Sequence, residues 1–458
     1  MASAAEQMAA NLNWGSFGKA KELQARILFA IGLLIVYRVG TYITVPGIDT
    51  IALREYFAQA SQGLGGMINA FTGGAVGRGA VLSLGIMPYI SASIIVQLMT
   101  AMVPSLESLK KDGEAGRKKI NQYTRYGTVA LATVQAYAIA VGLEGRELAL
   151  DPGMFFRITC VITLVCGTMF LLWLGEQITQ RGIGNGVSLI IFVGIIAELP
   201  AGIAQFLSQG RSGVYSTGFV LGLLVLAVVL VLVIVFMERA LRKIHIQYPR
   251  RQVGQQMYGG ESSNLPVKLN PSGVIPAIFA SAVLLMPATF AGFTEDQGDG
   301  VMGYILAYLG RGQPLYLLAF AALIIFFAYF YTANVAFKSE DVADNLKKQG
   351  GFIPGIRPGA RTVEYLDYVV ARILAVGSLY LAVVCLLPEL LFSGSSSVVP
   401  FFFGGTSLLI VVSVTMDTIT QVQSHMLAHQ YEGLIERSQL RGKGKGKAKG
   451  RTRSKVNR

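Results

Sequence analysis

Long apolar segments constrain this chain more than any other feature of its sequence. About ten of them reach the roughly 20 residues that a helix needs to cross a hydrocarbon core. They lack the alternating pattern of a membrane-spanning barrel, so helices are the expected way to satisfy their backbone polar groups in lipid. The expected spans are residues 24–43, 76–103, 122–142, 154–175, 185–207, 216–237, 271–293, 314–336, 367–387 and 399–420.

Composition and charge support a membrane protein and predict its orientation. Only 14% of the 458 residues are charged, against about 25% in soluble domains. If the N-terminus is cytoplasmic, 31 of the 39 Lys and Arg residues fall on cytoplasmic segments and five on the opposite side. Arg38, Arg157 and Arg372 lie in or at the edge of spans. The positive-inside rule therefore predicts a multi-pass membrane protein with both termini in the cytoplasm.

Two of the apolar spans share a nine-residue pattern. Gly, Pro, Ile, Ala and Ser of residues 85–93 recur at the same offsets in residues 273–281. The expected topology makes the two spans run in opposite directions, each as the second span of a five-span half. Chance is the competing interpretation, because apolar segments draw on few residue types. Duplication predicts inverted halves with a pathway at their interface.

Motifs for catalysis or for cofactor binding are missing from the sequence. It contains no P-loop, and His425 and His429, four residues apart, lack the acidic residue of a HExxH zinc site. The cysteines Cys160, Cys166 and Cys385 fall inside apolar spans, where they are expected to be small hydrophobic residues. We therefore expect no catalytic residue, no metal site and no cofactor.

Carboxylates inside the spans are scarce, which bears on the choice between a channel and a carrier. Coupled carriers generally need intramembrane acids, and apart from Asp367 at the first residue of one span, only Glu198 and Asp417 lie within the expected spans. Asp417 is expected to pair with Arg372, whereas Arg38 has no evident partner. Glu198 is expected to face a water-filled funnel or, in a carrier, to bind a cation. An inverted-repeat transporter for a small solute remains the alternative to a channel.

Three segments outside the spans have features of their own. The Gly-rich residues 63–74 fit either a re-entrant piece in a cavity or an external loop. In the cytoplasmic loop 337–366, two prolines and neighbouring glycines predict a stiff tip with Arg357 at its apex. The Lys- and Gly-rich tail within 421–458 is expected to be disordered until it meets an anion, such as ribosomal RNA or an acidic lipid headgroup.

Several motifs, in order along the chain from about residue 20 to about residue 437, resemble those of the SecY family, the channel subunits of the bacterial Sec protein translocon. The motifs are FTGGA (71–75), LGIMPYISASI (84–94), GRKKINQYTRYGT (116–128), RGIGNG (181–186), GVIPAIFAS (273–281), ADNLKKQGGFIPGIRPG (343–359) and PFFFGGTSLLIVV (400–412).

This resemblance implies an all-α polytopic membrane protein with ten transmembrane helices in two inverted five-helix halves. The halves would be residues 24–207 and 208–420, preceded by a cytoplasmic segment 1–23 and followed by the basic tail 421–458. They surround a central hourglass pore and open sideways to lipid at a lateral gate. The gate would lie between residues 76–100 with 122–142 on one side and 271–293 with 314–336 on the other.

The resemblance also implies site residues. An aliphatic pore ring falls on Ile86, Ile90, Val187, Ile191, Ile278 and Ile410, where Val187 replaces the commoner Ile. A plug that fills the external funnel falls on residues 63–74, with Gly65, Gly66, Met67, Ile68, Asn69, Ala70 and Phe71 at its centre. The residues expected to bind SecA or the ribosome are Arg357, Arg250 and Arg251. Gln255 and Gln256, in the loop 238–270, stand where some relatives carry a basic pair. This departure weakens the expectation that the tip of that loop contacts phosphate.

A member of this family would be a non-enzymatic protein-conducting channel. It would pass unfolded secretory chains across the cytoplasmic membrane and release transmembrane segments sideways into lipid, driven by the SecA motor ATPase or by the translating ribosome. SecE-like and SecG-like small subunits, signal peptides, nascent chains and acidic phospholipids would be its other partners.

Overall fold

A computed structural model describes residues 21–60, 69, 72–213, 216–248, 251–253, 256–258, 262–291, 313–393 and 404–427. The helices are α2 (Lys21–Gly40), α3 (Thr50–Ala60), α5 (Met87–Met102), α6 (Pro104–Lys111), α7 (Glu114–Glu144), α8 (Met154–Arg181), α9 (Gly186–Arg211), α10 (Thr217–Arg239), α11 (Ile275–Ala291), α13 (Pro314–Tyr331), α14 (Ser339–Lys348), α15 (Ala360–Ser393) and a last helix, Gly405–Leu427. A π-helical turn, Thr332–Ala336, follows α13, and the strands are β1 (Leu241–Gln247), β2 (Arg251–Val253), β3 (Gln256–Tyr258) and β4 (Ser262–Lys268).

The protein is an all-α polytopic membrane protein. Within the described residues, eight helical segments are long and apolar enough to cross a membrane, or nine if α5 and α6, bent by 98° at their junction, count as one span. The helix α11 is a shorter apolar helix. Each of the ten expected spans overlaps one helix, namely α2, α5, α7, α8, α9, α10, α11, α13, α15 and the last helix.

The start of one expected span was wrong. Residues 76–86 were expected to be helical, but residues 72–86 form successive turns and α5 begins only at Met87. Glycines with left-handed φ angles interrupt this stretch, among them Gly79 at +59° and Gly85 at +56°. An apolar run alone does not distinguish a helix from irregular backbone buried between helices. The external segment before it also contains a helix, α3, that was not expected.

The two copies of the repeated sequence have the same local structure. Gly85 and Gly273, which share an offset in the repeat, have φ angles of +56° and +61°. Two residues after each glycine a helix begins, α5 in one copy and α11 in the other. Pro88 and Pro276 are the second residues of these helices, where a missing backbone N–H costs nothing. The coincidence therefore extends from the sequence to the backbone conformation.

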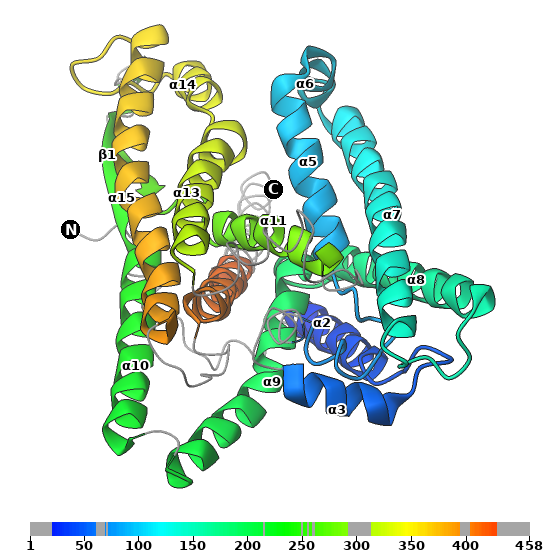
Figure 1. Cartoon of the computed structure of the whole chain (residues 1–458). Coiled ribbons are helices and arrows are strands. Elements are labelled where there is room, and N and C mark those ends of the chain that lie inside the picture. Colours follow the sequence, from blue (N-terminus) through cyan, green and yellow to red (C-terminus); the bar gives the residue numbers. More distant parts are fainter. Residues whose placement is uncertain are drawn as a thin grey trace, which may run out of the picture.

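Two groups of helices meet in one apolar core (Figure 1). In the first group α5 packs against α7, α7 against α8, and α8 against α2 and α9. In the second, α11 packs against α13, and α13 against α15. The groups join where α5 contacts α11, within a cluster of buried side chains that includes Ile90, Ile278 and Ile410.

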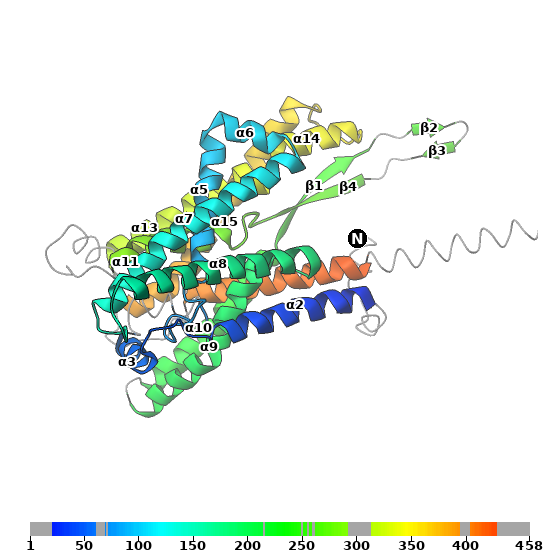
Figure 2. The same ribbon diagram turned by 90° about the vertical axis from the view of Figure 1, so that its right-hand side faces the viewer.

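The loops of the second group that are expected to be cytoplasmic form a small unit beyond the helices. The strands β1 and β4 make an antiparallel hairpin, with Leu241 opposite Lys268 and Gln247 opposite Ser262, and it projects from the bundle in Figure 2. A bridge between Gln247 and Phe352 joins this hairpin to the loop after α14. The shared apolar core of the unit contains Ile244, Val267, Ala343, Ile353 and Leu366.

The expected ion pair between Arg372 and Asp417 was wrong. The carboxylate of Asp417 instead lies 3.4 Å from the ammonium of Lys268, at the end of β4. The guanidinium of Arg372 lies over the ring of Tyr368, 4.2 Å from its centroid. Residues four apart are neighbours on a helix surface, so this aromatic partner is available to Arg372 without any tertiary contact.

We predict that Gly167→Ala destabilises the protein, although alanine normally favours a helix. A Cβ at this buried position in α8 would overlap the carbonyl oxygen of Val81, so the backbone before α5 has to move. Overpacking of this kind costs about 1–3 kcal/mol. The matched control is Gly32→Ala in α2, where a Cβ meets nothing within 4 Å. Thermal unfolding of the purified protein compares the two, and equal midpoints would contradict the prediction.

Candidate functional site: an aliphatic constriction

Four isoleucines from three helices surround one small cavity in the core between the two groups of helices. Ile86 and Ile90 come from the start of α5, Ile191 from α9 and Ile278 from α11. The volume of the cavity is about 20 Å³, and its other lining residues are Thr72, Met87 and Ser281. A space of about 10–15 Å³ is the least that holds one water molecule. The cavity therefore has no room for a polypeptide.

Local sequence places these side chains. Asn185 is the N-cap of α9, and its side-chain oxygen accepts hydrogen bonds from the backbone N–H groups of Val187 at 3.1 Å and Ser188 at 3.3 Å. The cap fixes where α9 begins, which puts Val187 in its first turn and Ile191 one turn later. Ile86 and Ile90 are likewise one turn apart on α5.

The other two members of the expected ring lie nearby but do not line the cavity. Ile410, in the last helix, is buried in the same apolar cluster as the four isoleucines. Val187 is half-buried and packs against this cluster. The structure thus brings all six expected side chains into one cluster, with four of them at the cavity.

The polar atoms in the cavity wall have partners inside the protein. The hydroxyl of Ser281 donates to the carbonyl oxygen of Ala277, one turn earlier in α11, at 2.8 Å. The hydroxyl of Thr72 donates to the carbonyl oxygen of Asn69 at 3.1 Å. Because these hydroxyls are engaged, the surface that the cavity offers is mostly methyl and methylene groups. Such a surface offers few hydrogen bonds to a passing chain.

The expected plug lies almost entirely outside the described residues. Gly65, Gly66, Met67, Ile68, Ala70 and Phe71 are not among them, and Asn69 is. The Asn69 side-chain oxygen accepts from the backbone N–H of Gly77 at 2.7 Å, and its carbonyl oxygen accepts from that of Gly74 at 2.8 Å. Asn69 thereby organises the turns of residues 72–80, which begin within the C-terminal end of the expected plug, residues 63–74.

A charged cluster that the sequence did not reveal holds these turns. One carboxylate oxygen of Glu198 lies 2.7 Å from the guanidinium of Arg78 and 3.6 Å from that of Arg38. Both arginines also donate to the carbonyl oxygen of Gly73, at 3.2 Å and 2.6 Å. Glu198 was expected either to face a water-filled funnel or to bind a cation in a carrier. Its observed partners are positively charged, but they are arginines of the protein itself. Arg78 lies in the expected span 76–103, in the part that is irregular rather than helical, and nothing in the sequence paired it with a residue 120 positions further along.

The backbone approach to this cluster requires glycine. Gly74 has a φ of +80°, and a Cβ there would collide with Glu198 and Arg78. Tyr42 contributes a ring face, with the guanidinium carbons of Arg78 and Arg38 at 4.4 Å and 5.1 Å from its centroid. The C-terminal end of the expected plug and the turns that follow it are therefore fixed to α2 and α9 by hydrogen bonds, ion pairs and cation–π contacts.

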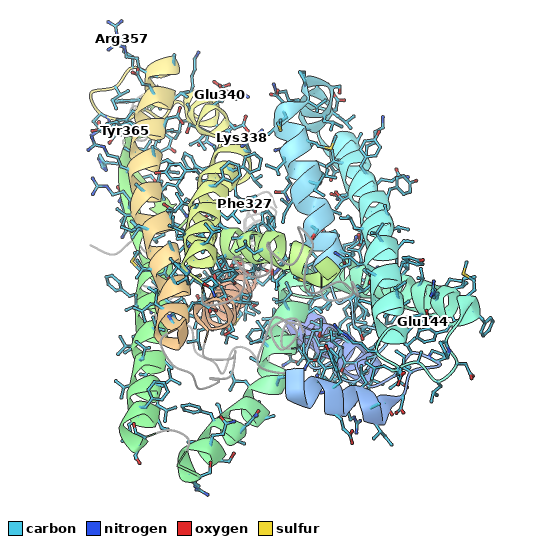
Figure 3. All side chains as sticks on the ribbon, viewed as in Figure 1. Glu144, Phe327, Lys338, Glu340, Arg357 and Tyr365 are labelled. Carbon is cyan, nitrogen blue, oxygen red and sulfur yellow. The ribbon has the colours of Figure 1, made fainter. Side chains whose placement is uncertain are left out.

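The expected docking residues are distributed over the cytoplasmic unit. Arg357 is exposed at the tip of the loop before α15, as Figure 3 shows, between Pro354 and Pro358. Its carbonyl oxygen accepts from the hydroxyl of Thr362 at 3.0 Å, which ties the tip to the start of α15. Arg251 lies in β2. The expected docking residue Arg250 lies outside the described residues.

No group of three or more His, Cys, Asp or Glu side chains is arranged to hold a metal ion within the described part of the chain. What is found there instead is an apolar constriction, a glycine-rich segment fixed above it by charged groups, and an exposed basic tip.

Comparisons with known proteins agree with this geometry. A family model described as SecY matches residues 80–419. The protein translocase subunit SecY of Rickettsia conorii (strain ATCC VR-613 / Malish 7) is 50% identical over 425 residues, which cover 92% of this chain and 97% of the relative. That of Escherichia coli (strain K12) is 50% identical over 432 residues, covering 93% and 97%.

Solved structures share the fold at lower identity. A protein-conducting channel superposes with a TM-score of 0.65 at 18% identity, covering 87% of this chain and 92% of the other. Sec61 in a canine ribosome–channel complex superposes with a TM-score of 0.58 at 16% identity, covering 87% and 92%. These relatives decide against the small-solute transporter. The chain therefore belongs to the SecY family, the protein-conducting channel subunits of the Sec translocase.

Proposed function

We propose that Ile86, Ile90, Val187, Ile191, Ile278 and Ile410 form the seal of the channel. The observation that supports this most directly is the cavity of about 20 Å³ on which side chains from α5, α9 and α11 converge. Aliphatic side chains offer a passing chain no charge to bind, and a narrow apolar constriction loses its water and so resists ions. They also separate without leaving a polar group unpaired, which suits a contact that has to open.

Residues 63–74 act as the plug in this proposal, and the cluster around Glu198 anchors their C-terminal end. Thr72 lines the cavity, and Arg38 and Arg78 hold the neighbouring Gly73 carbonyl. The anchor lets the plug move while the following turns keep their place beside the ring. The two halves, residues 24–207 and 208–420, would part along the side where α5 and α7 face α11 and α13.

The cytoplasmic unit is the docking site for SecA or the ribosome, with Arg357 at its centre and Arg250 and Arg251 in support. The tip is exposed, stiffened by two prolines and tied to α15, so a partner would meet a preformed surface. A solved relative of the same fold is described as Sec61 in a ribosome–channel complex. Work would come from that partner, since the chain would act without enzymatic activity of its own.

Orientation follows from charge, and the remaining partners follow from the family. Both termini would be cytoplasmic, because 31 of 39 Lys and Arg residues fall on that side. SecE-like and SecG-like subunits would complete the complex. The basic tail would meet acidic phospholipids or ribosomal RNA, and signal peptides and nascent chains would pass through the ring.

We predict that Ile278→Asn opens an ion leak or relaxes the selectivity for signal sequences, because a polar group wets the constriction. Ion conductance of reconstituted channels measures the leak. Ile278→Leu, which keeps the wall apolar, should stay tight. Ile195→Asn is the control for the effect of burying an asparagine anywhere in the core. Ile195, in α9, is buried like Ile278 but does not line the cavity. A tight membrane with normally folded Ile278→Asn would refute the seal, and so would an equal leak from Ile195→Asn.

Removing the carboxylate of Glu198 should destabilise the segment beside the plug. In Glu198→Gln the partly buried Arg38 and Arg78 lose their ionic partner, which is expected to cost about 1–3 kcal/mol. The control is Glu22→Gln, whose pair with Arg26 lies on the surface of α2 and whose loss should cost less than about 1 kcal/mol. Thermal unfolding midpoints separate the two, and equal shifts would show that the cluster anchors nothing.

Arg357→Glu should abolish SecA-driven transport while the protein stays folded, because the charge at the tip is reversed. Transport of a secretory precursor into membrane vesicles measures the effect. Arg361→Glu is the matched control, since Arg361 is also exposed but lies within α15 rather than at the tip. Normal transport by Arg357→Glu, or equal loss in both variants, would argue against docking at the tip.

A further inference from the structure

The short helix α6 connects the two groups of helices at the end of the molecule that carries α14 (Figure 1). It follows α5 after a bend of 98°, at the step from Val103 to Pro104. Its Lys110 ammonium donates a hydrogen bond of 3.0 Å to the backbone carbonyl oxygen of Asn334, 224 residues further along the chain. Lys110 belongs to the first group and Asn334 follows α13 of the second, so this bond spans the seam between them.

The acceptor lies in an unusual piece of backbone. Residues Thr332–Ala336 form a π-helical turn after α13, closed by the N–H of Phe337 donating to the carbonyl oxygen of Thr332 at 3.0 Å. Carbonyl groups in the last turn of a helix are short of intrahelical donors, and the helix dipole makes this end negative. An ammonium group is a favourable partner there. Single π-turns are also frequent at functional sites.

Charged side chains on both rims interact across the same seam. On α6, the exposed side chains of Glu107 and Lys111 pair at 2.8 Å, whereas Lys110 bonds to Asn334. On the other rim lie Lys338 and Glu340, labelled in Figure 3. Lys338 is close enough to act electrostatically on Glu107 and to repel Lys110. The like charges of Lys338 and Arg117 therefore oppose the ammonium at this position, whereas Glu107 favours it.

The seam has a second closure deeper in the molecule. There α5 contacts α11 beside the aliphatic ring. A transmembrane segment that leaves sideways has to part α5 and α7 from α11 and α13, and it has to break both closures. The apolar closure yields to any apolar segment, because it exchanges one apolar contact for another. The bond of Lys110 has no such replacement in the segment.

We propose that the bond between Lys110 and the carbonyl of Asn334 is a latch at the cytoplasmic end of the lateral gate, and that it sets how hydrophobic a segment must be to enter lipid. The placement of this latch at the cytoplasmic end rests on the orientation proposed above. Opening is a shift between a closed and an open population, so the free energy of the latch adds to what an entering segment has to supply. Lys110 is thus a specificity-determining residue for lateral release.

The test compares Lys110→Met with Lys111→Met in the complete translocase in membranes. The substrate is a secretory protein with one test segment of marginal hydrophobicity, and the readout is the ratio of integrated to exported segment. Lys110→Met should raise this ratio about three- to tenfold, the factor expected for one partly exposed charge-assisted hydrogen bond. Lys111→Met removes an equal charge one residue away and should leave the ratio unchanged. Lys110→Arg keeps a charged donor and should remain close to the parent protein.

Export of a secretory protein without a test segment is measured in parallel, and it should be normal in all variants. An unchanged ratio in Lys110→Met, or an equal rise in Lys111→Met, overturns the latch. A changed ratio that appears only together with lost export also overturns it, because the contact would then serve the channel as a whole. If Lys110→Met does not accumulate, Lys110→Gln is measured in the same way, and an unchanged ratio there is decisive against the latch.

Discussion

Backbone polar groups at membrane depth need partners inside the protein, and this requirement decides where the chain can leave the helical conformation. Residues 72–86 are an irregular stretch packed among the helices. Arg38 and Arg78 donate to the Gly73 carbonyl, Asn69 bonds Gly74 and Gly77, and the Tyr37 hydroxyl donates to the Thr72 carbonyl at 3.4 Å. These contacts satisfy backbone groups that have no helical partner, so the irregular segment can lie beside the constriction.

The constriction is held together by apolar contacts, in contrast to the polar contacts that hold residues 72–86. Ile90, Ile191 and Ile278 belong to the core cluster that joins the two groups of helices, so the same contacts hold the groups together and close the path between them. Apolar contacts are non-directional, and a translocating segment can replace them with its own. Polar contacts are directional and specific. In the proposed mechanism, apolar contacts at the ring form a seal that can open, and polar contacts hold the end of the plug and the helix α6 in place.

Much of the architecture follows from local sequence, because hydrophobicity and charge report directly on lipid and on the side of the membrane. Each expected span overlaps a helix for that reason. The errors arise where tertiary contacts decide. The run 76–86 is apolar yet irregular, because glycines and the nearby helices fix its turns. Asp417 pairs with Lys268 rather than Arg372, since no pattern in the spans places the end of β4. Arg78 and Glu198 are 120 residues apart, and their meeting depends on how α9 packs against the segment before α5.

The long helix α15 has a mechanical consequence. It is one helix from Ala360, beside the basic tip, to Ser393, and its 34 residues correspond to about 50 Å at 1.5 Å per residue. It packs against α13, which packs against α11 of the constriction. The strand hairpin and the loop before α15 share one apolar core, so they move with the start of this helix. In the proposed docking mode, a push on the tip acts on the start of this long helix and through it on the packing with α13. Force generated outside the membrane would then displace helices within it, without the docked partner entering the pore.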